Sequence, residues 1–301
     1  MATPITAVRT GMMAVWNPRR PGWPGTSWKP SMLWPNFSQE CRNALKDLGL
    51  RGFWMGYFAG RAAPMGVVSP GVVEATFYNF HPAMVRRSLP DAWTLASPDS
   101  VLSVRTEAAA AALRRLAPEA DEVVPRLLPL LREAIEHGNG AGRALFAANR
   151  DVVVSDDLRG LWQAATTLRE HRGDGHVAIL TEADLDGCEA HVLFAATEGG
   201  PPELLRDNRG WSEHDWGRAT SRLCRRGLVR PEGGPTAAGR QLRRDIEERT
   251  DELATQPYRL LASDEVEEMI RLLSAIGRRI VTSGEIPFPN PMGLPEPGAA
   301  E

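Results

Sequence analysis

The sequence predicts a mainly α-helical protein with two tandem winged-helix-like repeats and a small β-wing in the second repeat. Apolar residues recur at helical spacing along most of the chain, and alternating, strand-like runs are scarce. Residues 50–54 read LRGFW and residues 158–162 read LRGLW, so the two segments are similar and lie far apart. The first observation predicts the helical class, and the second indicates an internal duplication.

Composition limits the function classes that need to be considered. Hydrophobic residues make up 43% of the 301 residues and charged residues 24%, which is typical of a globular protein that needs no membrane. A net charge of −3 gives the whole chain no general attraction for nucleic acid or anionic lipid. The three cysteines form no CxxC pair, which argues against a disulfide framework and a zinc knuckle. Because there is neither a long apolar run nor a secretory signal, we expect a cytoplasmic protein.

The helical pattern is interrupted by turn-forming residues, which separate the expected helices. Ser97 before Pro98 and Ser212 before Glu213 are typical helix starts. In the first half we expect helices over 39–48, 50–62, 69–77, 81–88, 97–116 and 121–137. In the second half we expect them over 156–170, 186–198, 212–227, 236–254 and 263–283.

The internal similarity extends beyond the LRG motif and predicts a division of the chain. Residues 111–115 resemble 221–225, and residues 123–135 resemble 267–280, at a growing offset. Chance similarity among Leu/Arg-rich helices is the alternative interpretation. The predicted parts are a leader (1–31), a first, degenerate winged-helix repeat (32–137), a linker (138–155), a second repeat (156–285) and a Pro-rich tail (286–301).

The second repeat carries a recognisable order of motifs over residues 186–254. A short helix precedes a capped helix that ends in RRGLVRP, and a Gly-Gly turn leads into TAAGRQL and a long amphipathic helix. This order resembles the MarR-like winged helix-turn-helix family. The resemblance implies that the helix before RGLV is a recognition helix, that a β-wing follows it, and that TAAGRQL opens a dimerisation helix.

The whole chain also resembles an actinobacterial family of MarR-like helix-turn-helix proteins without an assigned activity. The motifs that carry this resemblance are GFWMGYFAGRAAPMG (52–66), ATFYNFHP (75–82), LREHRGDGHVA (168–178) and NPMGL (290–294). The resemblance implies a fold, with the two repeats forming an intramolecular pseudo-dimer.

DNA binding has arguments on both sides. Arg218, Arg222 and Arg225 can share one helix face, which would suit contacts with phosphates. The start of the same helix reads SEHD, however, and its carboxylates would face the DNA. The expected wing is short, and the first repeat lacks one, so the pseudo-dimer would have one complete reading head. The alternative is that these arginines are solvated or paired with acidic side chains.

A pocket between the repeats is the second candidate site, because the resemblance implies effector binding where the DNA-binding and dimerisation parts meet. The segment 75–82 would line it with Phe77, Tyr78, Phe80 and His81. The second lining segment is REHRGDGH (169–176), which we expect to be a glycine-containing loop. In the repeat alignment this loop lies opposite the apolar segment 62–68.

The sequence allows four interpretations of residues 169–176: a purely structural turn and three functional alternatives. In the binding alternative, Arg61, Arg169 and Arg172 hold an anionic, aromatic ligand. In the acid–base alternative, Asp174 orients His171 or His176 and Tyr78 donates to a substrate oxygen.

The third alternative is a metal site, for which the sequence offers a weak ligand set. His171 and His176 would need Glu170 or Asp174, with His191 or His81 completing the set. There is no HExxH motif, so we predict no metal.

These observations predict a small-molecule-binding protein on a MarR-like winged-helix scaffold. The alternatives are a ligand-responsive DNA-binding regulator and a cofactor-independent or metal-assisted enzyme. GxSxG, P-loop and GxGxxG motifs are lacking, so we expect no cofactor. We expect a monomeric pseudo-dimer or a homodimer without a membrane partner.

Overall fold

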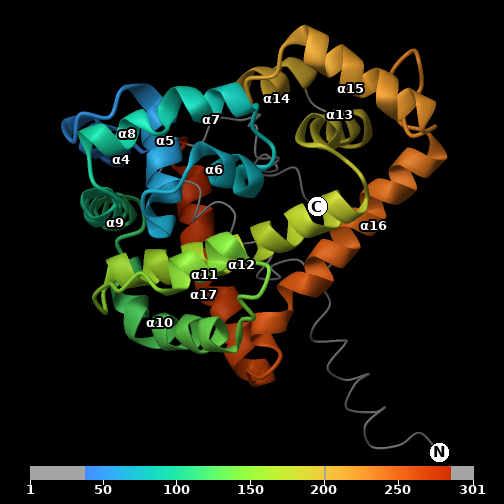
Figure 1. Ribbon diagram of the computed structural model, residues 1–301. Helices are drawn as coiled ribbons and strands as arrows, with labels where there is room; N and C mark the ends of the chain where they lie inside the picture. Colours follow the sequence, from blue (N-terminus) through green and yellow to red (C-terminus); the bar gives the residue numbers. More distant parts are fainter. Residues whose placement is uncertain (1–37, 200, 286–301) are drawn as a thin grey trace, which may run out of the picture.

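The computed structural model describes residues 38–199 and 201–285, and these residues form a helical protein (Figure 1). The predicted mainly α class is confirmed. In the first half the helices are α4 (Gln39–Asp47), α5 (Gly52–Ala62), η2 (Ala63–Met65), α6 (Pro70–Phe77), α7 (Pro82–Ser88), α8 (Asp91–Leu95), α9 (Pro98–Leu116) and α10 (Ala120–His137). In the second half they are α11 (Ala144–Arg150), α12 (Leu158–Glu182), α13 (Gly187–Glu198), α14 (Pro202–Asn208), α15 (Glu213–Arg225), α16 (Ala237–Ala254), η3 (Gln256–Tyr258) and α17 (Ser263–Thr282).

The predicted β-wing is wrong for the residues that the structure describes, which contain no strand. The wing position holds one isolated antiparallel bridge, between Val229 and Pro235. Gly233 and Gly234 both have positive φ and turn the chain tightly, and Pro235 has no N–H to extend a ladder. The segment is therefore a closed turn between α15 and α16.

Helix α12 crosses the middle of the molecule and packs against α9, α10, α11 and α16 (Figure 1). It runs on to Glu182, so the prediction that residues 169–176 form a loop is wrong. The glycines that suggested a turn have another role. A Cβ on Gly175 would lie 2.6 Å from a guanidinium nitrogen of Arg143, so the glycine makes room for that side chain.

Three clusters of buried apolar residues hold the helices together. The central core joins α9, α10, α12 and α17, for example through Leu127, Leu161 and Ile276. The N-terminal core joins α4 to α9, and the C-terminal core joins the end of α12 to α13, α15 and α16. The central core therefore contains helices from both halves of the chain.

The segments predicted as linker, leader and tail do not all have the structure expected from the sequence. The expected linker 138–155 contains α11, whose Leu145 and Phe146 are buried. The leader 1–31 and the tail 286–301 lie outside the described residues. None of the helices described here is both long enough and apolar enough to span a membrane.

Candidate functional site

Helices α13, α14 and α15 form a helix-turn-helix unit at one end of the molecule (Figure 1). Capping boxes start α13 at Asp186 and α15 at Ser212, and each box satisfies the backbone N–H groups of the N-cap and of the third helical residue. Helix α15 packs on α13 and buries Ala219 and Leu223 against the C-terminal core. A third helix held across the first is the arrangement in which the third helix can read a DNA groove.

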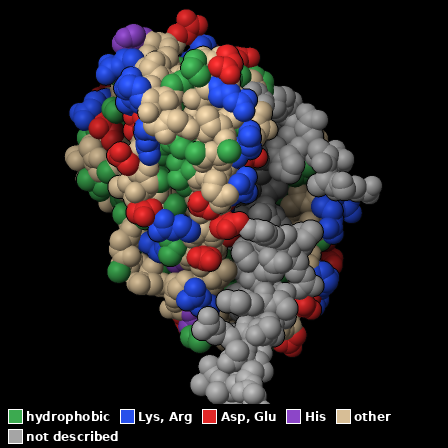
Figure 2. Space-filling model, turned by 90° about the vertical axis from the view of Figure 1, so that its right-hand side faces the viewer, with side chains coloured by type: hydrophobic (Ala, Val, Ile, Leu, Met, Phe, Trp, Pro, Cys, Tyr) green, Lys and Arg blue, Asp and Glu red, His purple; other side chains and the backbone are tan. Residues whose placement is uncertain are grey.

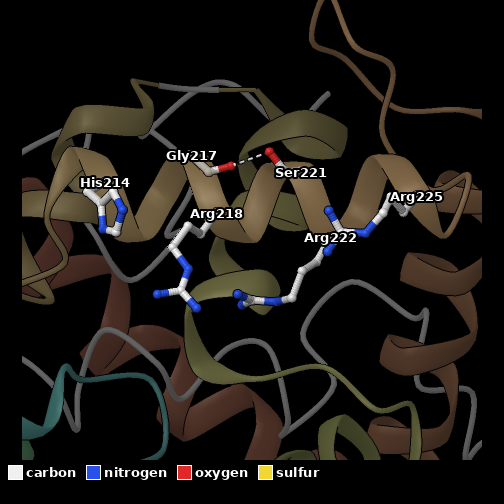
Figure 3. A pocket seen from close by; sticks show the side chains of 6 residues that line it. All are labelled: His214, Gly217, Arg218, Ser221, Arg222 and Arg225. Carbon is white, nitrogen blue, oxygen red and sulfur yellow. Dashed lines mark hydrogen bonds between the residues drawn. The ribbon is translucent and has the colours of Figure 1, made fainter.

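The outer face of α15 is open to solvent and carries basic side chains. It borders a shallow pocket of about 470 Å³ (Figure 3). His214, Arg218 and Arg225 are exposed there, and Ser221 donates a hydrogen bond to the Gly217 carbonyl. Within the described part of the chain, neither Arg218 nor Arg225 forms an ion pair. The lining residues are His214, Gly217, Arg218, Ser221, Arg222 and Arg225.

Arg222, the third arginine predicted to contact DNA, has an internal role. Its guanidinium lies 2.6 Å from Glu189 Oε1 and 2.5 Å from Asp186 Oδ2, at the start of α13. Arg222 therefore ties α15 to α13 and contributes little net charge to the outer face.

The two carboxylates at the start of α15 differ in their exposure, because Asp215 is turned back onto the helix end and Glu213 is exposed. Asp215 turns back to accept hydrogen bonds from the Ser212 hydroxyl at 2.5 Å and the Ser212 N–H at 3.1 Å, and these bonds lower its pKa. Glu213 is 86% exposed and lies 3.4 Å from Arg206. One exposed acidic side chain, Glu213, therefore lies beside His214 at the end of the helix expected to enter a groove.

The segment 78–81 joins the helix-turn-helix unit to the first half of the chain. Tyr78 donates its hydroxyl proton to the Leu185 carbonyl at 2.5 Å, and Trp211 Nε1 donates to the Asn79 carbonyl at 3.1 Å. The His81 N–H donates to the Arg209 carbonyl at 2.8 Å. These contacts fix both the start of α13 and the turn before α15.

The residues predicted for acid–base chemistry point to different partners. His171 Nε2 lies 3.2 Å from Gln256 Oε1, and His176 Nδ1 lies 3.0 Å from the Thr250 hydroxyl. Asp174 accepts the Phe146 N–H at 2.9 Å, on the side of α12 that faces α11. Tyr78 is engaged with Leu185, as described above. No hydrogen bond joins any two of these side chains among the described residues, although His171 and Asp174 both contact Phe146.

Burial changes the titration of two of these groups. It lowers the pKa of His171 to about 3, with help from Arg143, and it raises the pKa of Asp174 to about 6. His171 is therefore neutral at pH 7. In the described residues no three His, Cys, Asp or Glu side chains are grouped as metal ligands, so the metal alternative has no ligand set there.

The three arginines predicted to hold an anionic ligand, Arg61, Arg169 and Arg172, lie in two different places. Arg61 donates two hydrogen bonds of 2.9 Å to Glu170, and Arg169 pairs with the same carboxylate. Arg172 instead reaches α16, where it lies 3.1 Å from Glu247 and 2.9 Å from Asp251. Only Arg61 and Arg169 therefore meet.

Phe77 and Phe80 support this meeting point, whereas His81 lies apart from it. The Arg61 guanidinium stacks over Phe77, 4.3 Å from the ring centroid. Phe80 lies in the N-terminal core, where it packs against Phe58 with ring centroids 5.0 Å apart. The His81 side chain caps α7 by accepting the Ala83 N–H.

Sequence reasoning missed two residues at the meeting point, Tyr57 and Arg209. The Arg209 guanidinium lies 4.6 Å from the centroid of Phe80, and the Tyr57 ring lies 5.5 Å from the same ring. Tyr57 precedes Arg61 by one helical turn, so the two side chains lie on the same face of α5, and this spacing could have identified Tyr57 as a neighbour of Arg61. Arg209 had no local signal, because it reaches the cluster from the turn before α15.

Comparison with known proteins gives one result that covers most of the chain. The model of a helix-turn-helix family matches residues 26–287. No curated protein matches the chain, and no solved structure does. The match includes the three helices described above, and it extends over both halves of the molecule. The chain belongs to this helix-turn-helix family.

Proposed function

We propose that the protein is a DNA-binding regulator and that α15 is the helix that enters the major groove. The observation that carries this proposal is the outer face of α15, where Arg218 and Arg225 are exposed and lack an acidic partner among the described residues. The family assignment supports the same function.

The spacing of the two arginines suits this role. Residues seven apart in an α-helix are separated by about 10.5 Å along the axis, and the major groove of B-DNA is about 12 Å wide. Because Arg218 and Arg225 lie on one face of α15, a helix docked at the groove can direct both guanidinium groups to the phosphate backbone. His214 and the backbone beside Gly217 would face the base edges.

The charge distribution predicts modest, salt-sensitive affinity. On the side of the molecule seen in Figure 2, basic and acidic side chains are interspersed, without one continuous basic surface. The net charge is −3. Binding must therefore depend on a few local phosphate contacts, and each contact releases about one counterion.

The proposal is tested by fluorescence anisotropy with a labelled random-sequence duplex over a series of salt concentrations. We expect the double variant Arg218→Gln/Arg225→Gln to bind at least about tenfold more weakly, with a slope of log K against log salt shallower by roughly 1.8. Arg87→Gln is the matched control, because Arg87 is exposed on α7, away from α15. No binding by the unmodified protein at low salt, or equal binding by the double variant, would refute the proposal.

The finer relationship to MarR-like proteins belongs to the same proposal. We take 32–137 and 156–285 as two repeats that form a pseudo-dimer, with α5, α9 and α10 corresponding to α12, α15 and α17. Helices at all of these positions support this division. Ligand binding between the repeats is the second candidate function, and it is favoured by the meeting of Arg61 and Arg169 at Glu170 beside Phe77.

A further inference from the structure

Gly217 is an exposed glycine in the interior of α15, and it lines the pocket on the outer face of that helix (Figure 3). Glycine lowers the stability of an exposed helix interior relative to alanine, because it loses more backbone entropy on folding. A glycine in such a position therefore needs a reason. The usual reasons are a left-handed backbone conformation, a crowded neighbour, or the close approach of a partner.

The fold of the described residues supplies neither of the first two reasons. Gly217 lies within the α-helix and does not have positive φ. A Cβ at this position would meet no atom of the described residues within 4 Å. At Gly160 and Gly239, by contrast, a Cβ would lie 2.2 Å and 2.0 Å from a backbone carbonyl oxygen, so packing requires those two glycines. The close approach of a partner remains as the reason for Gly217.

The helix surface around Gly217 is low and is bordered by longer basic side chains. Ser221, one turn later, folds its hydroxyl back to donate a 2.9 Å hydrogen bond to the Gly217 carbonyl. Figure 3 shows this bond lying along the helix, whereas the Arg218 side chain extends away from it. His214 and Arg218 are exposed and line the same pocket. The backbone of α15 is therefore accessible at Gly217.

We propose that Gly217 sets how deeply α15 enters the major groove, because the helix backbone comes closest to the base edges at this residue. This role rests on the DNA-binding function proposed above. A side chain at position 217 would project from the helix and hold its backbone away from the bases. Base edges carry the sequence information, whereas phosphates carry none directly. Gly217 is therefore a residue that determines specificity.

The exposed arginines supply the part of binding that does not depend on sequence. Arg218 and Arg225 have long side chains, which can still reach phosphates when the helix moves outwards by the size of a methyl group. Attraction between charges falls slowly with distance, whereas a hydrogen bond to a base edge needs a separation of about 3 Å. An outward displacement of α15 therefore removes base contacts before it removes phosphate contacts.

The test compares the affinities of the full-length protein and of Gly217→Ala for two labelled duplexes by fluorescence anisotropy. One duplex is selected from a random pool by the unmodified protein, and the other has a random sequence. We expect Gly217→Ala to bind the random duplex within about twofold of the unmodified protein, and the selected duplex at least about tenfold more weakly. Gly217→Leu should weaken binding of the selected duplex further. Urea denaturation should show no loss of stability in Gly217→Ala.

Gly71→Ala is the matched control. Gly71 is an exposed glycine in the first turn of α6, and the nearest atom to a Cβ there would be Ser69 Oγ, 3.9 Å away. This variant should bind both duplexes as the unmodified protein does.

Three results would overturn the role of Gly217 and leave DNA binding by α15 intact. Gly217→Ala could bind the selected duplex as tightly as the unmodified protein, or it could lose the same affinity for both duplexes. The unmodified protein could also bind the two duplexes equally well. In each case the unmodified protein still binds DNA. If it binds neither duplex at low salt, the DNA-binding function and the role of Gly217 are both wrong.

Discussion

At the scale of single residues, Asp174 shows how burial links titration to stability. The residue is 8% exposed, and burial raises the pKa of its carboxyl from 3.8 to about 6. Between these two values the folded protein binds a proton more tightly than the unfolded chain does. The free energy of unfolding contributed by this group therefore decreases as the pH rises from about 4 to 6 and stays low above that range.

We predict that Asp174→Asn removes this dependence. At pH 8 the variant should be more stable than the unmodified protein by up to about 3 kcal/mol, because the amide is neutral and can still accept the Phe146 N–H. Urea denaturation at pH 4.5 and pH 8 measures the difference. Asp47→Asn, at an exposed position on α4, is the control. Identical pH profiles for Asp174→Asn and the unmodified protein would contradict the prediction.

His191 has the opposite pH dependence. Burial, with Arg209 and His176, lowers its pKa from 6.5 to about 3, so the unfolded chain binds the proton more tightly between these values. Stability should therefore fall as the pH drops below about 6.5, and this group alone accounts for about 2 kcal/mol at pH 5. We predict that His191→Leu shows a shallower loss of stability between pH 7 and pH 5 in urea denaturation. An unchanged slope would mean that the imidazole is accessible to protons in the folded state.

At the scale of elements, helix positions were predictable and the roles of glycines were not. Helical periodicity identified α9, α10 and α16 within a few residues. The glycines of RGDG suggested a turn, but Gly173 and Gly175 lie inside α12, and Gly175 makes space for Arg143. The sequence cannot show this, because Arg143 comes from another part of the chain. Glycine composition alone does not distinguish a turn from close packing.

The start of α13 offers a direct test of such packing. A Cβ on Gly187 would lie 2.1 Å from the Tyr78 carbonyl oxygen, whereas a Cβ on Gly217 of α15 would meet nothing within 4 Å. We predict that Gly187→Ala lowers the free energy of unfolding by about 1–3 kcal/mol. The matched variant Gly217→Ala should raise it by roughly 0.5–1 kcal/mol through helix propensity.

The same pair of variants reports on how the helix-turn-helix unit is attached. In Gly187→Ala, hydrogen exchange should increase at the start of α13 and in the 78–81 segment, because the alanine pushes these segments apart. Equal stability of the two variants would contradict the prediction, because it would show that the contact between Gly187 and Tyr78 accepts a Cβ without cost.

At the scale of the whole molecule, the sequence could predict the site residues that lie on a single helix. It could not predict the contacts that form between distant segments of the chain. Arg218 and Arg225 follow from the spacing on one helix, and both line the pocket on α15. The partners of Arg222 and the position of Arg209 depend on packing between distant segments, so periodicity could not supply them. The fold likewise joins helices of both halves in one core, which no local pattern shows.

The two halves present very different surfaces for DNA. Helix α9, the proposed counterpart of α15, packs against α4, α5 and α12 and buries residues such as Ala109, Ala112 and Leu113. Helix α15 buries only Ala219 and Leu223 and leaves its outer face open. Under the repeat proposal, therefore, one chain offers one recognition helix although it contains two repeats.

This difference predicts the stoichiometry of DNA binding. Binding sites selected from a random duplex pool should be either asymmetric and occupied by one chain, or palindromic and occupied by two chains, since each half-site needs its own α15. Sedimentation of the protein with the selected duplexes counts the chains. A palindromic site with both halves protected by a single chain would contradict the prediction, because it would require a second reading surface in the first half of the molecule.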